Sequence, residues 1–395
     1  MRSSAPMPVL AALIMLLIFA FAPIEQATAA DALLKVLWSK PVPAAHQSEA
    51  LILFKRIRNA DGSIAFVATG GLMTAPNESG PGPVTSWKSK NGRVLTIAQG
   101  KENTFWLAGL INQRSYVPGG DISDAYLAKI DSEGRLIDEH IYKSWFRFRG
   151  IRDLLPLDSG EVVVAEQNWL AKIADNGKIL WEKKFRLQKE VALSKIGDQF
   201  VVATIEGNMT GGEQKYQDNV VVRIYSSDGR IFTAPIIRSG INNEKGGHYG
   251  DLEITESPDN TIYVSSNWND LFKAKPIEVS KISKDGNIIW RKELAHSISL
   301  NPNKTWVSCK PALTVLADDD LLVACAIKED LFIYRLDAIT GKVSVKSIAL
   351  PQCYESRPAS LFLTQRPNGK IWLFGSRPSN NVAASCTWLG ELILE

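Results

Sequence analysis

Apolar and polar residues alternate along most of this chain in short runs that end at Asp, Asn or Gly. In WLAKIADNGKILWEKKF, from Trp169 to Phe185, two such runs flank Asp175-Asn176-Gly177. An Asn-Gly pair between alternating runs predicts a β-hairpin, because both central turn residues need a positive φ that Asn and Gly tolerate. We therefore expect this stretch to form two antiparallel strands joined by a tight turn.

The same kind of hairpin recurs along the sequence. Each copy has an apolar strand that carries Lys or Arg and a turn that ends in Gly; the other copies span residues 126–142, 220–232, 279–294 and 332–348. Hairpins of a second type, with turns of Asp, Asn, Gly or Pro, lie between them and occur in seven copies. Two hairpins in series form a four-stranded antiparallel unit, and units repeating at about 40 to 60 residues indicate a β-propeller.

The two ends of the chain predict how the ring closes. TWLGELILE, from Thr387, supplies a third strand to the last unit but no fourth. KVLWSKPV at residues 35–42 matches KILWEKKF at residues 178–185, so the N-terminal strand is expected to complete the last blade. We predict an all-β fold, a seven-bladed β-propeller of four-stranded antiparallel blades closed by the N-terminal strand, with residues 31–395 as a single domain.

The first residues have the features of a secretory signal. Arg2 precedes an apolar run from Val9 to Ala22, and a small-residue site follows at Ala27 to Ala30. We expect residues 1–30 to be cleaved and the mature chain to be periplasmic or secreted. The apolar run is shorter than the roughly 20 residues that span a bilayer, so no membrane span is expected in the mature chain.

Four cysteines in an exported chain favour disulfides: Cys309, Cys325, Cys353 and Cys386. Three pairings are possible, and proximity favours Cys309 with Cys325 and Cys353 with Cys386. The cysteines have no Cys-x-x-Cys spacing, so no metal site is predicted. The 45 basic and 42 acidic side chains give no field that would attract nucleic acid or a membrane. We expect a monomer whose partner is a small polar ligand or an envelope protein.

Some of the hairpins share a short motif with a known repeat. LDAITGKVSV contains Asp337, Thr340 and Gly341, and a Gly lies four residues before Trp181 and before Trp290. These features resemble the repeat of PQQ-like, quinoprotein-type propellers, Ala-x-Asp-x-x-Thr-Gly-x-x-x-Trp. The resemblance implies the propeller architecture. Dehydrogenases of that family have eight blades, adjacent cysteines near the quinone, and carboxylate and Asn ligands to calcium, whereas this chain has seven units and no adjacent cysteines. We therefore predict no cofactor, with a quinone or calcium as the alternatives.

The long connections are expected on one face of the ring, which we call the loop face, around the central channel. They are residues 112–124, 206–218, 239–249, 296–310, 352–358 and 377–387. Aligned inner strands place charged residues at one entry position: Glu49, Arg152 or Asp153, Glu190, Asp251, Lys310 and Arg357. We interpret these charges as a binding ring at the channel mouth. The alternative is that strand ends favour solvated charges that pair with their neighbours.

GGHYGDLEI, at residues 246–254, is the densest local candidate for chemistry. His248, Tyr249 and Asp251 could serve as base, hydrogen-bond donor and acid, and the alternative is a loop whose His simply packs or is solvated. Asp318-Asp319-Asp320 is interpreted as turn chemistry. The predicted function is an exported ligand- or protein-binding scaffold with its site on the loop face. The alternative is an envelope enzyme, either a quinone-dependent dehydrogenase or a carbohydrate-active lyase or hydrolase.

Overall fold

A computed structural model describes most of the chain after residue 32. The described residues are 33–41, 55–58, 64–68, 72–74, 84–86, 92–102, 104–114, 122–143, 150–184, 188–210, 215–233, 236–241, 248–269, 277–294, 311–327, 330–349, 360–366, 368–377 and 386–394. Their regular structure consists of strands. In this part of the chain no helix is long and apolar enough to cross a membrane. The predicted signal at residues 1–30 lies outside it.

The described strands form seven antiparallel sheets, six of four strands and one of five. The first three in chain order contain β2 (Lys55–Arg58), β3 (Ile64–Ala68), β4 (Leu72–Thr74) and β5 (Val84–Ser86); β6 (Gly92–Gln99), β7 (Phe105–Arg114), β8 (Ile122–Ile130) and β9 (Leu136–Tyr142); and β10 (Asp153–Pro156), β11 (Val162–Glu166), β12 (Trp169–Ile173) and β13 (Ile179–Lys184). Every predicted hairpin in these sheets is confirmed.

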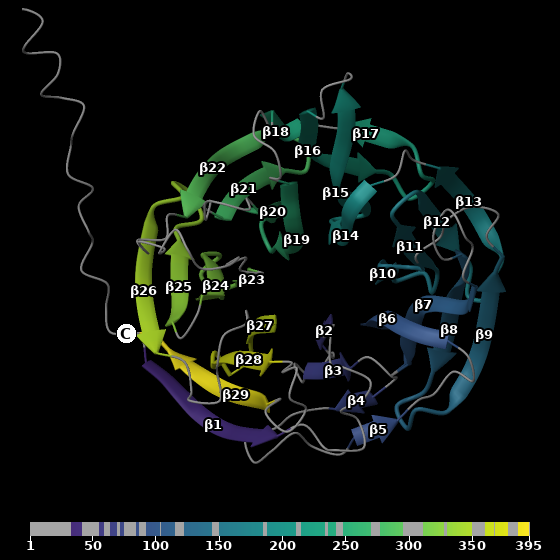
Figure 1. The fold of residues 1–395 in the computed structure, drawn as a ribbon, viewed down its shortest axis with the longest axis horizontal. Coiled ribbons are helices and arrows are strands. Elements are labelled where there is room, and N and C mark those ends of the chain that lie inside the picture. The colour runs from purple at the N-terminus through teal and green to yellow at the C-terminus, as the bar shows by residue number, and fades with distance from the viewer. Residues whose placement is uncertain are drawn as a thin grey trace, which may run out of the picture.

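The remaining sheets complete the ring. They contain β14 (Gln188–Ile196), β15 (Gln199–Thr210), β16 (Lys215–Tyr225), β17 (Ile231–Thr233) and β18 (Ile236–Ile241); β19 (His248–Ser257), β20 (Thr261–Asn269), β21 (Ile277–Ser283) and β22 (Ile288–Leu294); β23 (Ala312–Val315), β24 (Leu321–Ile327), β25 (Asp330–Leu336) and β26 (Val343–Ala349); and β27 (Ser360–Gln365), β28 (Ile371–Arg377) and β29 (Cys386–Ile393) with β1 (Leu33–Pro41). Figure 1 shows them around a common centre, with β6, β10 and β14 among the inner strands.

The N-terminal strand closes the ring, as the sequence predicts. β1 pairs antiparallel with β29 from Leu33 opposite Ile393 to Pro41 opposite Cys386, and β29 pairs in turn with β28. Figure 1 shows β1 at the rim beside β29. The fourth strand of the last blade therefore comes from the opposite end of the chain, and the prediction of an all-β propeller is confirmed.

The hydrophobic core lies between neighbouring blades. Trp106 and Leu127 of the β6–β9 blade share one buried cluster with Val164 of the β10–β13 blade. On its other side the β10–β13 blade contributes Val163 to a cluster with Phe200 of the next blade. Alternate residues of a strand point to opposite faces of its sheet, so a strand such as β11 packs against both neighbouring blades. This is why runs such as Val162–Ala165 are apolar throughout and fully buried.

A β-bulge recurs in the outer strands. Lys172 pairs with Trp181 and Ile173 with Ile179, so Leu180 is the extra residue; the same shift leaves out Ile137, Phe232, Ile289 and, in β1, Leu37. The bulge turns Leu180 out, 45% exposed, and Trp181 back toward the next blade, where a Cβ at Gly229 would lie 2.8 Å from Trp181 Cε2. Its presence in β1 confirms β1 as an outer strand.

The turn geometry corrects one prediction. Of Asp175, Asn176 and Gly177, Gly177 alone has a positive φ (78°). Gly177 N donates to Ala174 O and Ala174 N to Lys178 O, both at 2.9 Å. This pattern belongs to a three-residue loop, in which a type I turn is followed by one left-handed residue. The predicted turn with two positive φ angles is wrong, because the extra residue places the left-handed position on Gly177 alone.

Among the residues that the structure describes, Glu102 is the non-glycine residue least suited to its backbone conformation. Its φ is 53°, whereas the other positive-φ side chains are Asn112, Asn260 and Asp319, types that tolerate this region. We expect Glu102→Gly to raise the free energy of unfolding by about 0.5–1 kcal/mol in urea denaturation. Asn260→Gly, the matched control, should change it little. A destabilised Glu102→Gly variant would show that the Glu102 side chain makes a stabilising contact.

Three of the predicted long loops are partly strand. β15 and β16 pair from Phe200 opposite Tyr225 out to Thr210 opposite Lys215, through most of the predicted 206–218 loop. β7 and β8 extend likewise, to Arg114 opposite Ile122, into the predicted 112–124 loop. β18 pairs with β16 inside the predicted 239–249 loop, from Gln217 opposite Ile241. The prediction of a loop is wrong at these paired residues, because the ladders continue beyond the end of the blade's inner strand.

Candidate functional site

Asp153, one of the predicted channel-mouth residues, is a buried structural carboxylate. It opens β10 on the loop face and is 7% exposed. Its Oδ1 accepts a hydrogen bond from Leu154 N, and its Oδ2 accepts one from Leu193 N of the next inner strand, both at 2.7 Å. The carboxylate therefore joins the start of β10 to the middle of β14 in the next blade.

Arg152, its neighbour, is held in place by the backbone. Arg152 N donates to Ala165 O at 2.8 Å, and the preceding Ile151 N donates to Gly109 O of the β6–β9 blade at 3.0 Å. The side chain is partly buried, and its Nε is buried without a hydrogen-bond partner. A buried donor left unpaired costs about 1–3 kcal/mol, so such groups are normally satisfied by water or a bound group.

Two amide oxygens on the loop face share this condition. Asn168 Oδ1 lies in the turn between β11 and β12, and Asn219 Oδ1 lies on β16; both are buried without a hydrogen-bond partner. Arg152 Nε is a donor and the two amide oxygens are acceptors. The loop-face ends of the β10–β13 blade and the blade after it thus carry both kinds of unpaired group.

The other predicted residues are placed only in part. Glu190 is exposed on β14, where the register with β15 shifts. His248, Tyr249 and Asp251 lie in β19, with His248 opposite Asn269 and Asp251 at a register shift, so the predicted loop at 246–254 is largely strand because β20 continues far enough to pair with it. Glu49, Lys310 and Arg357 lie outside the described residues, and the binding ring stays a prediction.

The cysteines are described in part. Cys325 is fully buried in β24 and disulfide-bonded. Cys386 opens β29, while Cys309 and Cys353 lie outside the described residues. The pairing of Cys309 with Cys325 and of Cys353 with Cys386 therefore stays a prediction. In the part of the chain that the structure describes, no group of three or more His, Cys, Asp or Glu side chains is arranged to hold a metal.

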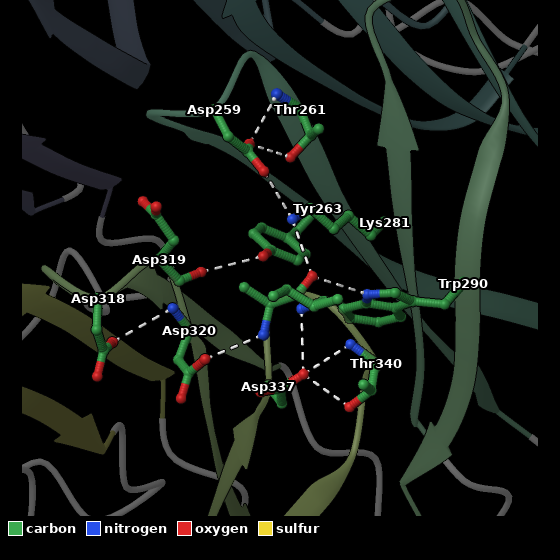
Figure 2. A network of polar contacts seen from close by, with 12 residues as sticks. Asp259, Thr261, Tyr263, Lys281, Trp290, Asp318, Asp319, Asp320, Asp337 and Thr340 are labelled. Carbon is green, nitrogen blue, oxygen red and sulfur yellow. Dashed lines mark hydrogen bonds and ion pairs between the residues drawn. The ribbon is translucent and has the colours of Figure 1, made fainter.

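The opposite face, which we call the turn face, carries a polar network between the β19–β22 and β23–β26 blades (Figure 2). Lys281 is 4% exposed, and its Nζ donates to Asp259 Oδ2 at 2.8 Å and to Ala338 O at 2.9 Å. Trp290 Nε1 donates to the same carbonyl at 3.2 Å, and Tyr263 OH donates to Asp319 O at 3.1 Å. Donors from one blade thus hold both turns of the next.

In the sequence, this network corresponds to the Lys or Arg that recurs in each outer hairpin. Like Lys281, Lys129 and Lys172 reach the next blade, at Asp175 Oδ1 (2.6 Å) and Ser227 O (3.4 Å). The sequence shows these cations at one repeat position, but not that they cross between blades. The turn predicted for Asp318-Asp319-Asp320 is confirmed, with Asp318 and Asp320 both pairing with Arg335.

The ion pair of Asp259 and Lys281 makes stability depend on pH. Burial raises the pKa of Asp259, but hydrogen bonds from Lys281 and Thr261 outweigh it and leave that pKa below the usual 3.8. For Lys281, burial lowers the pKa, and the bonds to Asp259 and Tyr263 raise it overall above 10.5. The stabilisation is therefore present between these limits, and is lost as pH falls through the lowered pKa of Asp259 or rises through the raised pKa of Lys281.

We expect Asp259→Asn to lower the free energy of unfolding at pH 7 by about 1–2 kcal/mol. The loss stays moderate because the Asp259 side chain is 37% exposed and solvent screens part of the pair. Urea denaturation at several pH values should show the full difference from wild type above about pH 4 and a shrinking one below it. A difference that stays constant down to pH 2 would contradict this account.

Comparison with known proteins identifies the fold class. No protein-family model and no curated sequence match the chain. The WD40 domain of Neurospora crassa Pan2 is similar over 93% of this chain and 97% of that domain, at 12% identity and a TM-score of 0.52. At this identity the likeness shows the fold alone, and the chain is a β-propeller.

Two further solved structures are similar at lower scores. A Fusarium graminearum GH93 α-L-arabinofuranosidase in complex with arabinobiose matches 78% of this chain and 95% of that one, at 11% identity and a TM-score of 0.45. A Bacteroides caccae protein of unknown function matches 54% of this chain at 14% identity and a TM-score of 0.31. This chain spans 64% of that protein, less than two thirds of its length.

Proposed function

We propose that this propeller is an exported binding or scaffold protein that takes a small polar ligand or an envelope protein at its loop face. The observation that carries the proposal is Arg152, a cation at the entry of the β10–β13 blade whose buried Nε has no hydrogen-bond partner. Asp153 is held by the backbone of Leu154 and Leu193. Arg152 is thus positioned to bind an acceptor, and the amide oxygens of Asn168 and Asn219 require a donor. A ligand with both groups, such as a sugar acid, an amino acid or a peptide, fits this combination.

Export is supported by two separate features. The N-terminal residues have the parts of a cleavable signal, and Cys325 is disulfide-bonded, a state that persists in oxidising compartments. Mass spectrometry of the mature protein should place its first residue at Ala30 or Asp31. An intact N-terminus that begins at Met1 would contradict export by this signal.

We also propose that the repeat is related to that of PQQ-like propellers. Asp337 Oδ1 accepts from Thr340 N at 2.6 Å and from Thr340 Oγ1 at 2.7 Å, which caps the turn before Gly341. Trp290 of the preceding blade packs on this turn, and a Cβ at Gly341 would lie 2.9 Å from its Cδ2. The shared motif residues therefore build the contact between blades, which gives a physical reason for such a repeat.

The binding proposal is tested by calorimetric titration of the folded protein with L-glutamate, D-glucuronate and a Gly-Glu dipeptide. We expect at least one to bind wild type and to bind Arg152→Gln at least about 10-fold more weakly, since a charge-assisted hydrogen bond is lost. Arg230→Gln is the matched control, because Arg230 is 86% exposed on the turn face. Equal affinities for wild type and Arg152→Gln, or no binding by any probe, would overturn the proposal.

A further inference from the structure

A cavity of about 180 Å³ opens on the turn face between the β6–β9 and β10–β13 blades. Residues from three turns line it, among them Thr104, Ser159 and Asp175, and Trp106 and Lys129 contribute from the strands. Most cavities that bind drug-sized ligands are larger, so this one has the size for a small metabolite. It lies away from the loop face, and the binding proposed there does not depend on it.

The cavity corresponds to a site that other blades fill with their own carboxylate. The third-strand cation is held by an acid from the inner turn of its own blade in three cases: Lys172 by Glu161 (3.3 Å), Lys281 by Asp259 (2.8 Å) and Arg335 by Asp320 (2.7 Å). Lys129 is the equivalent cation of the β6–β9 blade. Its ion pair is with Asp175 of the next blade, and no acid of its own inner turn contacts it within the described residues.

The strand register fixes which residues correspond. Glu161 and Asp320 lie two residues before the partner of their cation, and Asp259 lies four residues before it. Lys129 pairs with Trp106 in the β7–β8 ladder, and Lys281 pairs with Tyr263 in the β20–β21 ladder. Counting back along both second strands places Thr104 at the position of Thr261 and Glu102 at that of Asp259. Figure 2 shows the filled version, in which the Asp259 carboxylate lies between Thr261 and Lys281.

The backbone of the turn explains why Glu102 does not take this place. In the filled turn the left-handed residue is Asn260, and Asn260 N donates to Ser257 O. In the other turn it is Glu102, and Thr104 N donates to Lys101 O instead. The turn is thus shifted by one residue, and the Glu102 side chain is exposed to solvent. The cation and the threonine are kept, and a cavity lies beside them.

We propose that this cavity binds the carboxylate group of a small organic acid. Lys129 Nζ takes the role that Lys281 has toward Asp259, and Thr104 Oγ1, which now donates to Lys101 O at 2.6 Å, can rotate to donate to the ligand. Trp106 lines the same cavity, and Lys129 Nζ lies 5.4 Å from the centroid of its ring. Lys101 at the rim offsets the negative charges of Glu102 and Asp175.

The test is a titration of the full-length mature protein with succinate and propionate, with succinamide as the neutral analogue. We expect saturable binding of the acids, no binding of succinamide, and affinity at least about 10-fold lower in Lys129→Gln. A Gly-Gly-Gly peptide and its C-terminal amide distinguish a free acid from a peptide terminus as the source of the carboxylate. No saturable binding of any carboxylate to wild type, or equal affinity in folded Lys129→Gln, would overturn the proposal.

A second variant keeps the test decisive if Lys129→Gln is poorly folded. The filled turn reads Ser-Pro-Asp-Asn-Thr and the open one Gly-Lys-Glu-Asn-Thr, so Lys101→Pro/Glu102→Asp rebuilds the former. Proline fixes the φ of a type I turn, and the new Asp supplies the missing carboxylate. We expect this variant to be more stable than wild type and to bind succinate at least about 10-fold more weakly. Unchanged binding by the stabilised variant would contradict the proposal.

Two controls separate the possible causes of a loss of succinate binding. Lys101→Ala should weaken binding less than the double variant, because it removes the rim charge without filling the cavity. Both proposed sites take a carboxylate, so each is titrated with the other removed: the cavity in Arg152→Gln and the loop face in Lys129→Gln. Failure of one site with retention of the other therefore identifies which of the two proposals is wrong.

Discussion

A chain that lacks residues 33–41 is expected to lose its cooperative unfolding transition. β1 forms eight register pairs with β29, and without them the last blade would have three strands and an exposed edge at β29. Leu34 would also be lost from the buried cluster around Trp388, where it packs so closely that a Cβ at Gly390 would lie 2.6 Å from Leu34 Cδ1. Urea denaturation followed by tryptophan fluorescence measures the effect.

Moving the strand gives the control for this deletion. Leu33 pairs with Ile393, so a three-residue Asp-Asn-Gly loop after the end of β29 can lead directly into the sequence of residues 33–41. The rearranged blade would then have its third and fourth strands joined in a hairpin, like β12 and β13. We expect this permuted chain to regain a cooperative transition. If it stays unfolded, the connection from β1 into the next blade matters more than the strand itself.

Much of the architecture can be predicted from the sequence because its units repeat. Alternation and turn glycines are local signals that recur from hairpin to hairpin, and the match of residues 35–42 to residues 178–185 is local as well. The sequence does not predict the bulge at Leu37 and Leu180, although both residues lie in the same Lys-x-Leu-Trp pattern. A register shift depends on the partner strand, which a single stretch of sequence does not reveal.

The candidate sites are harder to predict from the sequence, because they depend on contacts between blades. The sequence places the charges of Arg152 and Asp153 at one aligned position, but the two side chains differ in role: Asp153 ties β10 to Leu193, and Arg152 keeps a buried unpaired Nε. No feature of the sequence predicts the turn-face cavity. It arises from a one-residue shift of the turn at Glu102, and no repeat comparison without backbone angles distinguishes Glu102 from Asp259.

Gly150→Ala is expected to destabilise the protein by about 3 kcal/mol or more. Gly150 has a φ of 85°, and an added Cβ would lie 2.6 Å from Leu110 Cβ and 2.9 Å from the carbonyl of Gly109. These atoms belong to the backbone and the base of a side chain, so moving them aside costs free energy. The contact lies beside the hydrogen bond from Ile151 N to Gly109 O, which joins the entry of the β10–β13 blade to the preceding blade.

Gly160→Ala separates the two causes of this loss. Gly160 also has a positive φ, 100°, but no atom lies within 4 Å of an added Cβ. Its substitution should therefore cost only the backbone strain, about 1–2 kcal/mol, and the difference between the two variants in urea denaturation measures the close approach of the blades. Arg152 follows the same contact, so Gly150→Ala should also weaken loop-face binding while Gly160→Ala leaves it intact. Equal losses of stability in the two variants would mean that the chain at Gly150 can move away from Gly109 without cost.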